Sequence, residues 1–184
     1  MHGIRISAST MLLAGLLAGS ATGVAAQDEP PDPMAPALVT GTIAWASSCD
    51  PATTTAEEGL IQERGHHCAP RTVTSDDPRL GGTSSVTWNK DVHLFDGPRL
   101  GIRTTVEEIQ GVGGGWVCRA VVLDGSSGFF ATSIQGSELT TCTGNGTNQG
   151  LTALLVLTTG NGQEAFEGLI FPGELPPGPV LAAE

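Results

Sequence analysis

The chain has 184 residues, with 19 aspartates and glutamates against 8 lysines and arginines, so its formal net charge is −11 at pH 7. This balance excludes a nucleic-acid-binding protein and disfavours contact with anionic lipid headgroups, because phosphates attract basic surfaces. We expect the acidic surface to serve solubility rather than recognition.

Residues 1–26 have the pattern of an export signal. Arg5 supplies a positive charge before the apolar run 11–19, and residues 24–26 provide the small side chains that a signal peptidase requires, which predicts cleavage after Ala26. The apolar run is shorter than the roughly 20 residues that cross a bilayer, so no membrane span is expected. The mature protein is therefore predicted to be secreted.

The remaining chain divides into three parts by composition. Residues 27–36 are rich in proline and acidic residues, which is typical of a disordered leader. Residues 37–171 carry the strand-like segments and are expected to form one β-barrel domain. Residues 172–184 are again rich in proline and are expected to be an extended tail.

The four cysteines all lie in the mature part and predict two disulfides. Three pairings are possible, and we favour Cys49–Cys68 with Cys118–Cys142, because sequential pairing closes one local loop and joins one pair of strands. The first bridge closes a loop of about 20 residues, worth about 3 kcal/mol in the chain-entropy model. Zinc is the alternative, but Cys-x-x-Cys spacing is absent and thiolates would be oxidised, so no metal site is expected.

Segments rich in β-branched and aromatic residues alternate with turn residues along the domain. Residues 49–70 are interpreted as a long hairpin excursion clamped by its cysteines, with one or two turns of helix at 55–64 as the alternative. Asp124-Gly125 and Asn161-Gly162 are two-residue hairpin signals. Strands are expected at 37–45, 71–74, 84–88, 91–95, 100–109, 116–123, 128–134, 137–142, 150–157 and 164–171.

Nine or ten short strands without a long amphipathic helix exclude βαβ units and predict an all-β fold. Residues 100–107 alternate apolar and polar side chains with a period of two, as a half-buried strand does. We prefer an antiparallel β-barrel of about eight strands, with a two-sheet β-sandwich as the alternative. The barrel is favoured because its hairpins follow sequence order and 26 glycines supply bends and bulges at barrel corners.

Four motifs occur in a fixed order: Asp-Pro-Arg (77–79), Gly-Gly-Trp (114–116), Gly-Asn-Gly-Thr-Asn-Gln-Gly-Leu (144–151) and Glu-Gly-Leu-Ile-Phe-Pro-Gly (167–173). This pattern resembles uncharacterised secreted bacterial proteins and, more loosely, the allene oxide cyclase and dirigent barrels, which carry Gly-x-Gly-x-aromatic-x-Gly in a late strand. Asn148 stands where those families have an aromatic ring. The resemblance implies an eight-stranded barrel, but no catalytic residue can be matched by position.

No motif predicts a catalytic residue or a cofactor, and no cofactor is expected. The glycine-rich stretches 111–116 and 144–149 do not open a helix that could bind a phosphate, and both are interpreted as turns. The serines at 126–127 lie in an expected hairpin loop rather than in the strand-to-helix turn of an esterase.

A few polar and aromatic residues are weaker candidates. His66-His67 is the most conspicuous cluster, yet adjacent imidazoles point apart in most backbone conformations, so an exposed loop pair is expected rather than a metal site. One member of Glu107-Glu108 should face inward, where it would lie beside Arg103 with a shifted pKa, although a strand end in solvent is preferred. We expect the three tryptophans to pack in the core rather than to line a pocket. They are Trp45, Trp88 and Trp116.

These observations predict a non-enzymatic extracellular β-barrel that binds a small ligand or serves as a structural or interaction module. A small apolar ligand is the partner that such a barrel would take. The alternative is an isomerase or cyclase acting on a small apolar substrate in the barrel mouth. A charged Glu or Arg lined by Trp and Leu inside the lumen would favour chemistry, and a filled lumen would favour a structural role.

Overall fold

The computed structural model describes residues 32–96, 99–125, 137–160 and 163–177. Within these ranges the chain consists of β-strands and one turn of 3-10 helix, η1 (Pro78–Leu80), with no α-helix. The strands are β1 (Ala37–Ala44), β2 (Cys49–Asp50), β3 (Thr53–Glu57), β4 (Leu60–Ser75), β5 (Gly82–Leu94), β6 (Arg99–Gln110), β7 (Gly114–Gly125), β8 (Ser137–Gly146), β9 (Leu151–Gly160) and β10 (Gln163–Pro172).

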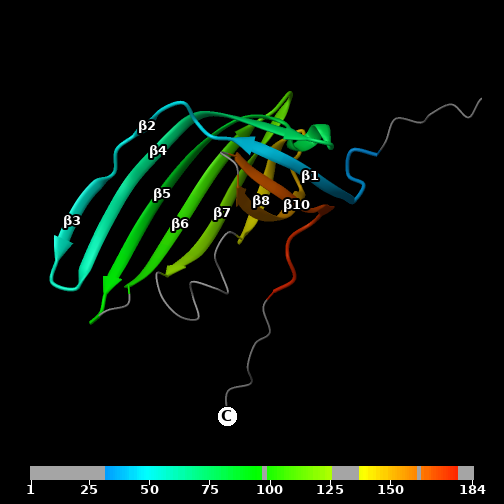
Figure 1. The fold of residues 1–184 in the computed structure, drawn as a ribbon. Helices are drawn as coiled ribbons and strands as arrows, with labels where there is room; N and C mark the ends of the chain where they lie inside the picture. The colour runs from blue at the N-terminus through cyan, green and yellow to red at the C-terminus, as the bar shows by residue number, and fades with distance from the viewer. Residues whose placement is uncertain (1–31, 97–98, 126–136, 161–162, 178–184) are drawn as a thin grey trace, which may run out of the picture. The chain divides into compact units, whose positions relative to one another are not determined.

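Eight of these strands close into an antiparallel barrel (Figure 1). Neighbours in sequence from β4 to β10 pair one after another, and β10 pairs with the whole of β1. The ring closes where residues 41–43 of β1 pair with residues 73–75 at the end of β4. The expected eight-stranded barrel is therefore confirmed, and the strands form one continuous sheet rather than the two of a sandwich.

The strand β4 is longer than its share of the ring. Its 16 residues pair first with β3, then with β2 and last with β1, so its first half lies beyond the point of closure. Figure 1 shows β3, β4, β5 and β6 extending together past β1 and β10. The barrel thus continues at one end into a sheet extension.

The excursion 49–70 is a hairpin, as expected, but its arms are regular strands, and the helical alternative at 55–64 is wrong. Residues 53–57 of β3 pair in register with residues 60–64 of β4. The chain reverses between them at Gly59, whose φ of 77° lies in the left-handed region that glycine adopts without strain.

Two β-bulges explain why the full length of β4 could not be predicted from the sequence. The register with β5 shifts between Glu63 and His66 and again between Cys68 and Arg71. Each shift adds an unpaired residue and reverses the order of inward and outward side chains, so the period-two pattern breaks although the strand continues. Only the last part of the strand, 71–74, was predicted.

Two other boundaries differ from the sequence expectation. The segments 84–88 and 91–95 form the single strand β5, because Asn89 and Lys90 continue the pairing with β6. Asp124 and Gly125 are not a two-residue turn: they remain in β7, paired with β6, and the next described strand begins at Ser137. The dipeptide 161–162 and the expected strand 128–134 lie outside the described residues.

The barrel core fills the lumen at the end of the ring where η1 lies, which we call the closed end. Inward side chains of seven of the eight ring strands, all but β5, meet there, and Trp116 and Leu80 are fully buried. The core consists of Val39, Ile43, Val73, Leu80, Ile109, Trp116, Cys118, Cys142, Leu151, Ala153, Leu155, Leu157, Phe166 and Ile170.

The turn η1 is held at the closed end through the backbone of Arg79. The Arg79 carbonyl accepts a hydrogen bond from Trp116 Nε1 at 2.7 Å and another from Asn148 Nδ2 at 3.1 Å. Three of the four motifs that carried the family resemblance therefore meet at one place. Their role in this fold is to close the barrel, and Asn148 contributes there as a buried hydrogen-bond donor.

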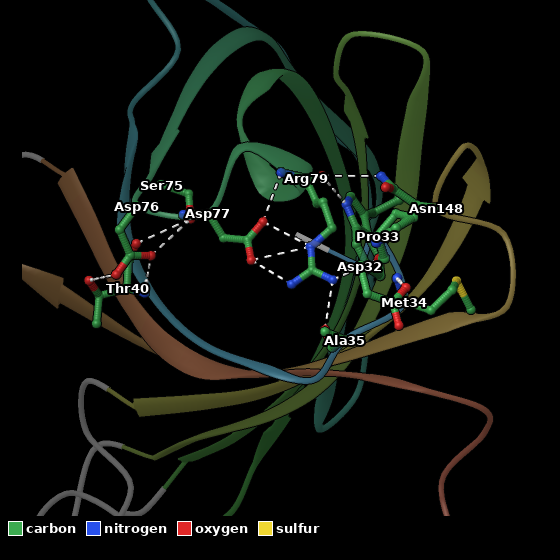
Figure 2. A network of polar contacts seen from close by, with 11 residues as sticks. Asp32, Pro33, Met34, Ala35, Thr40, Ser75, Asp76, Asp77, Arg79 and Asn148 are labelled. Carbon is green, nitrogen blue, oxygen red and sulfur yellow. Dashed lines mark hydrogen bonds and ion pairs between the residues drawn. The ribbon is translucent and has the colours of Figure 1, made fainter. Parts of the chain in front are cut away.

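The Arg79 side chain joins the closed end to the segment that precedes β1 (Figure 2). Its guanidinium pairs with Asp77 at 2.6 Å and donates to the carbonyls of Pro33 and Ala35, each at 2.9 Å. The hydrogen bond from Arg79 holds the pKa of the Asp77 carboxyl below its ordinary value. The start of β1 is thus fixed at the closed end, and its last residues point to the opposite end.

Both disulfides have the expected pairing. Cys49–Cys68 joins β2 to β4, and Cys118–Cys142 joins the neighbouring strands β7 and β8. The second bridge lies inside the core, where both of its cysteines are buried. Cys49 of the first bridge is exposed, whereas Cys68 is buried beneath it.

Candidate functional site

A pocket, which we call the mouth pocket, lies in the lumen at the end of the barrel opposite η1. Its cavity measures about 40 Å³, which is room for about three water molecules at ~10–15 Å³ each. Inward side chains of six strands and the segment that follows β1 surround it. The lining residues are Trp45, Ala46, Cys68, Arg71, Val86, Trp88, Arg103, Thr105, Glu107, Glu138, Leu157 and Glu164.

Arg71 of β4 forms the centre of a buried ion-pair cluster in this pocket. Its Nη1 lies 3.0 Å from Oε1 of Glu107 on β6, and its Nη2 contacts Oε2 of Glu164 on β10. Ser84 Oγ donates to the same oxygen of Glu107 at 2.6 Å. The Arg71 and Glu107 side chains are only 3% and 7% exposed, and charges so far from water are stable only when they are paired.

A second ion pair faces the same pocket. Arg103 Nη2 of β6 lies 2.9 Å from Oε2 of Glu138 on β8. Among the described residues, Arg103 Nε, Thr105 Oγ1 and Thr140 Oγ1 are buried without a hydrogen-bond partner. A buried polar atom without a partner costs free energy, so Arg103 and Thr105 present unused hydrogen-bonding capacity beside the cavity.

Burial dominates the electrostatics of two of the carboxyls. Loss of water raises the pKa of Glu107 above its ordinary value, and this effect outweighs the opposing attraction of Arg71 and the hydrogen bond from Ser84. Burial likewise raises the pKa of Glu138, against the attraction of Arg103. The charge of Glu164 repels both carboxylates and acts in the same direction.

Aromatic rings border the charged cluster. The guanidinium of Arg71 lies 6.0 Å from the centre of the Trp45 ring, within the range of a cation–π interaction. The Trp88 ring packs on the imidazole of His66, with 4.1 Å between ring centres. The pocket therefore combines two tryptophans with five charged side chains.

Glu107 is buried on the same face of β6 as Gly101 and Ile109, and Glu108 is exposed, so the preferred expectation of a strand end in solvent was wrong for Glu107. The expected neighbour was wrong, because Glu107 pairs with Arg71 and Arg103 pairs with Glu138. Two of the tryptophans line the pocket, and only Trp116 belongs to the core, which corrects the expectation that all three pack there.

Glu164 and Glu138 were not predicted as site residues. A signal for Glu164 existed, because it continues the inward series of Phe166 and Ile170 in steps of two along β10. Glu138 likewise continues the inward series of Thr140 and Cys142 in steps of two along β8, and its register opposite Leu157 of β9 agrees.

The two adjacent histidines point apart, as expected, but they lie half-buried in β4 and not in an exposed loop. His66 packs on Trp88, whereas His67 Nδ1 shares a hydrogen bond of 2.8 Å with Thr87 Oγ1. Within the described ranges, the one group of three metal-ligating side chains close enough to share an ion is Cys49, His66 and Cys68. Both sulfurs of this group are bonded to each other, so they are not thiolate ligands.

Comparison with known proteins gives no relative. The chain matches no known protein family, no curated protein and no solved structure. In the described part of the chain, no helix has the length and apolarity needed to cross a membrane.

The raised pKa of Glu107 predicts how its replacement changes the dependence of stability on pH. In the native protein the folded state holds the Glu107 proton more firmly than the unfolded state, so the stability it gives is complete below pH 4.5 and is lost as the pH rises through the raised pKa. The amide introduced by Glu107→Gln does not titrate. The free energy of unfolding of this variant, minus that of the native protein, should therefore increase as the pH rises.

Urea unfolding at several values between about pH 4 and about pH 8 measures this difference. Glu108→Gln, which changes the exposed neighbour on the same strand, is the matched control, and its difference from the native protein should stay nearly constant. A Glu107→Gln difference that is equally flat with pH would show that Glu107 is not desolvated.

Proposed function

We propose that this protein acts outside the cytoplasm and binds a small molecule in the mouth pocket. The observation that carries the proposal is the group of five charged side chains around a cavity that also contains buried polar atoms without partners. Pockets that recognise ligands combine apolar walls with a few convergent polar groups, and the mouth pocket has this composition. The two disulfides support a working place in an oxidising compartment.

The contrast between the two ends of the lumen supports binding over a purely structural role. At the closed end the lumen is filled by apolar side chains and a disulfide. At the mouth the same inward positions carry Arg71, Glu107 and Glu164, although a buried ion pair is commonly no more stable than apolar residues of similar volume. A charged lumen is therefore better explained by a ligand than by folding.

A second candidate function is an isomerase or cyclase that uses the same pocket. Charged glutamates beside Trp and Leu side chains are the feature that favours chemistry, and Glu107 and Glu138 have raised pKa values suited to proton transfer. Both carboxyls are engaged by arginines, so we rank binding first. Recovery of a bound compound as a rearranged isomer, at a rate that falls in Glu138→Gln, would favour the enzyme.

The three tryptophans allow a direct test of binding. In a fragment screen observed by ¹⁵N–¹H NMR, a pocket ligand should shift the indole signals of Trp45 and Trp88 and leave that of Trp116 unchanged, because Trp116 lies in the core at the closed end. The Phe variants of Trp45 and Trp88 assign the signals. If no fragment of any charge shifts Trp45 or Trp88, the protein is not a small-molecule binder at this pocket.

A further inference from the structure

We propose that the ligand of the mouth pocket is a slender organic cation, an alkylammonium or alkylguanidinium compound whose N–H groups donate to the pocket carboxylates. This inference rests on the proposed binding function and names its ligand class. It departs from the apolar ligand expected from the sequence, because the lumen at the mouth is charged.

The charges facing the cavity are unequal. Glu107, Glu138 and Glu164 stand against Arg71 and Arg103, which leaves one excess negative charge when all five are ionised. Lys90 of β5 lies opposite Arg103 and Glu63 in register but is not among the residues that line the cavity. A positively charged ligand would balance the excess and reduce the mutual repulsion of the carboxylates.

The carboxylates also have acceptor capacity left over. In the described part of the chain, the hydrogen bonds and ion pairs of Glu107 end on Oε1, and those of Glu138 and Glu164 end on Oε2. Among the described residues, the second oxygen of each carboxylate has no such contact. A ligand with several N–H donors satisfies acceptors of this kind, whereas an anion would add to the repulsion.

An organic cation fits these acceptors better than a metal ion does. A metal ion needs at least three ligand atoms close to one point, and in the described residues only Cys49, His66 and Cys68 come that near to one another. The three pocket carboxylates are thus too far apart to share one small ion. An ammonium or guanidinium group on an alkyl chain can reach acceptors that are spread along the pocket.

The walls of the pocket suit a cation with an apolar stem. Trp45 already holds the guanidinium of Arg71 near its ring, so this part of the site stabilises positive charge on an aromatic surface. Val86, Trp88 and Leu157 offer apolar contact for an alkyl chain. The narrow cavity of about 40 Å³ favours a slender molecule over a bulky one.

Butylammonium, 1-butanol and butyrate test the proposal, because they share one chain and differ in charge. Titrations followed by the Trp45 and Trp88 indole signals should give at least about tenfold tighter binding for butylammonium than for butanol, and weaker binding still for butyrate. Butylammonium binding should weaken as the pH falls through the raised pKa values of Glu107 and Glu138, because protonation removes the negative charges.

Two substitutions in β10 test whether butylammonium binds at the pocket carboxylates. Glu164→Gln removes a pocket carboxylate and should weaken butylammonium at least about fivefold, whereas Glu167→Gln removes an exposed charge from β10 and should leave binding unchanged. Equal binding of the three probes, a preference for butyrate, or equal effects of the two variants would overturn the cation proposal. If butylammonium does not bind while other fragments shift Trp45 and Trp88, the cation proposal fails and the binding function stands; if no fragment binds, both fail.

Discussion

Arg71→Met is expected to lower the free energy of unfolding by about 3–5 kcal/mol at neutral pH. The substitution keeps much of the volume of the side chain but leaves Glu107 and Glu164 without their shared partner in the lumen. An unpaired buried carboxylate either stays ionised at high cost or binds a proton. Urea denaturation measures the loss, which should shrink in acid because protonated carboxyls no longer need the guanidinium.

The matched control is Arg64→Met on the same strand. Arg64 pairs with Asp91 at 2.6 Å, but the two side chains are 43% and 35% exposed, and exposed pairs contribute at most about 1 kcal/mol. Combining Arg71→Met with Glu107→Gln should recover part of the lost stability, because one unpaired charge is then gone. If Arg71→Met and Arg64→Met lowered the free energy of unfolding equally, the buried ion-pair cluster around Arg71 would be contradicted.

Trp116→Ala should lower the free energy of unfolding by a similar amount, about 3–5 kcal/mol, for a different reason. The indole is fully buried at the closed end, and its Nε1 holds the carbonyl of Arg79. Truncation to alanine leaves a large cavity and releases one of the two side-chain donors that fix η1. Thermal and urea unfolding of the variant would both report the change.

Two further variants separate packing from hydrogen bonding at this position. Trp116→Phe keeps most of the ring volume, so its cost should be about 1–2 kcal/mol, close to that of one hydrogen bond and a small cavity. Trp88→Ala removes a half-buried ring from the mouth pocket and should affect ligand binding more than folding. A Trp116→Ala variant no less stable than Trp88→Ala would show that the closed end does not anchor the barrel.

Local patterns in the sequence were sufficient to predict the all-β barrel and its two disulfides. Alternation at 100–107 and the sequential cysteines predicted the strands and the bridges, because these signals depend on nearby residues. The length of β4 was missed, because bulges beside Gly65 and Pro70 break the alternation while the pairing with β5 continues. Bulges depend on the neighbouring strand, which a local pattern does not contain.

The site was less predictable than the fold. The alternation at 100–107 puts Glu107 on the polar face of its strand, so the sequence did not show that it lies in the lumen. Its partner Arg71 lies 36 residues away, and Glu164 lies 93 residues from Arg71. Which charges meet depends on the register of each strand around the ring. A shift of one residue in any strand would turn its inward side chains outward, so the ion-pair cluster is a property of the closed barrel.

The Cys49–Cys68 bridge has a consequence for the rim of the cavity. Cys49 follows Trp45 closely in sequence, and its bond to Cys68 tethers this connection to the neighbouring wall of the barrel. A short tether limits the positions that the indole can explore. The disulfide that crosslinks the chain thus restricts the conformations of Trp45, one aromatic wall of the pocket, before a ligand binds.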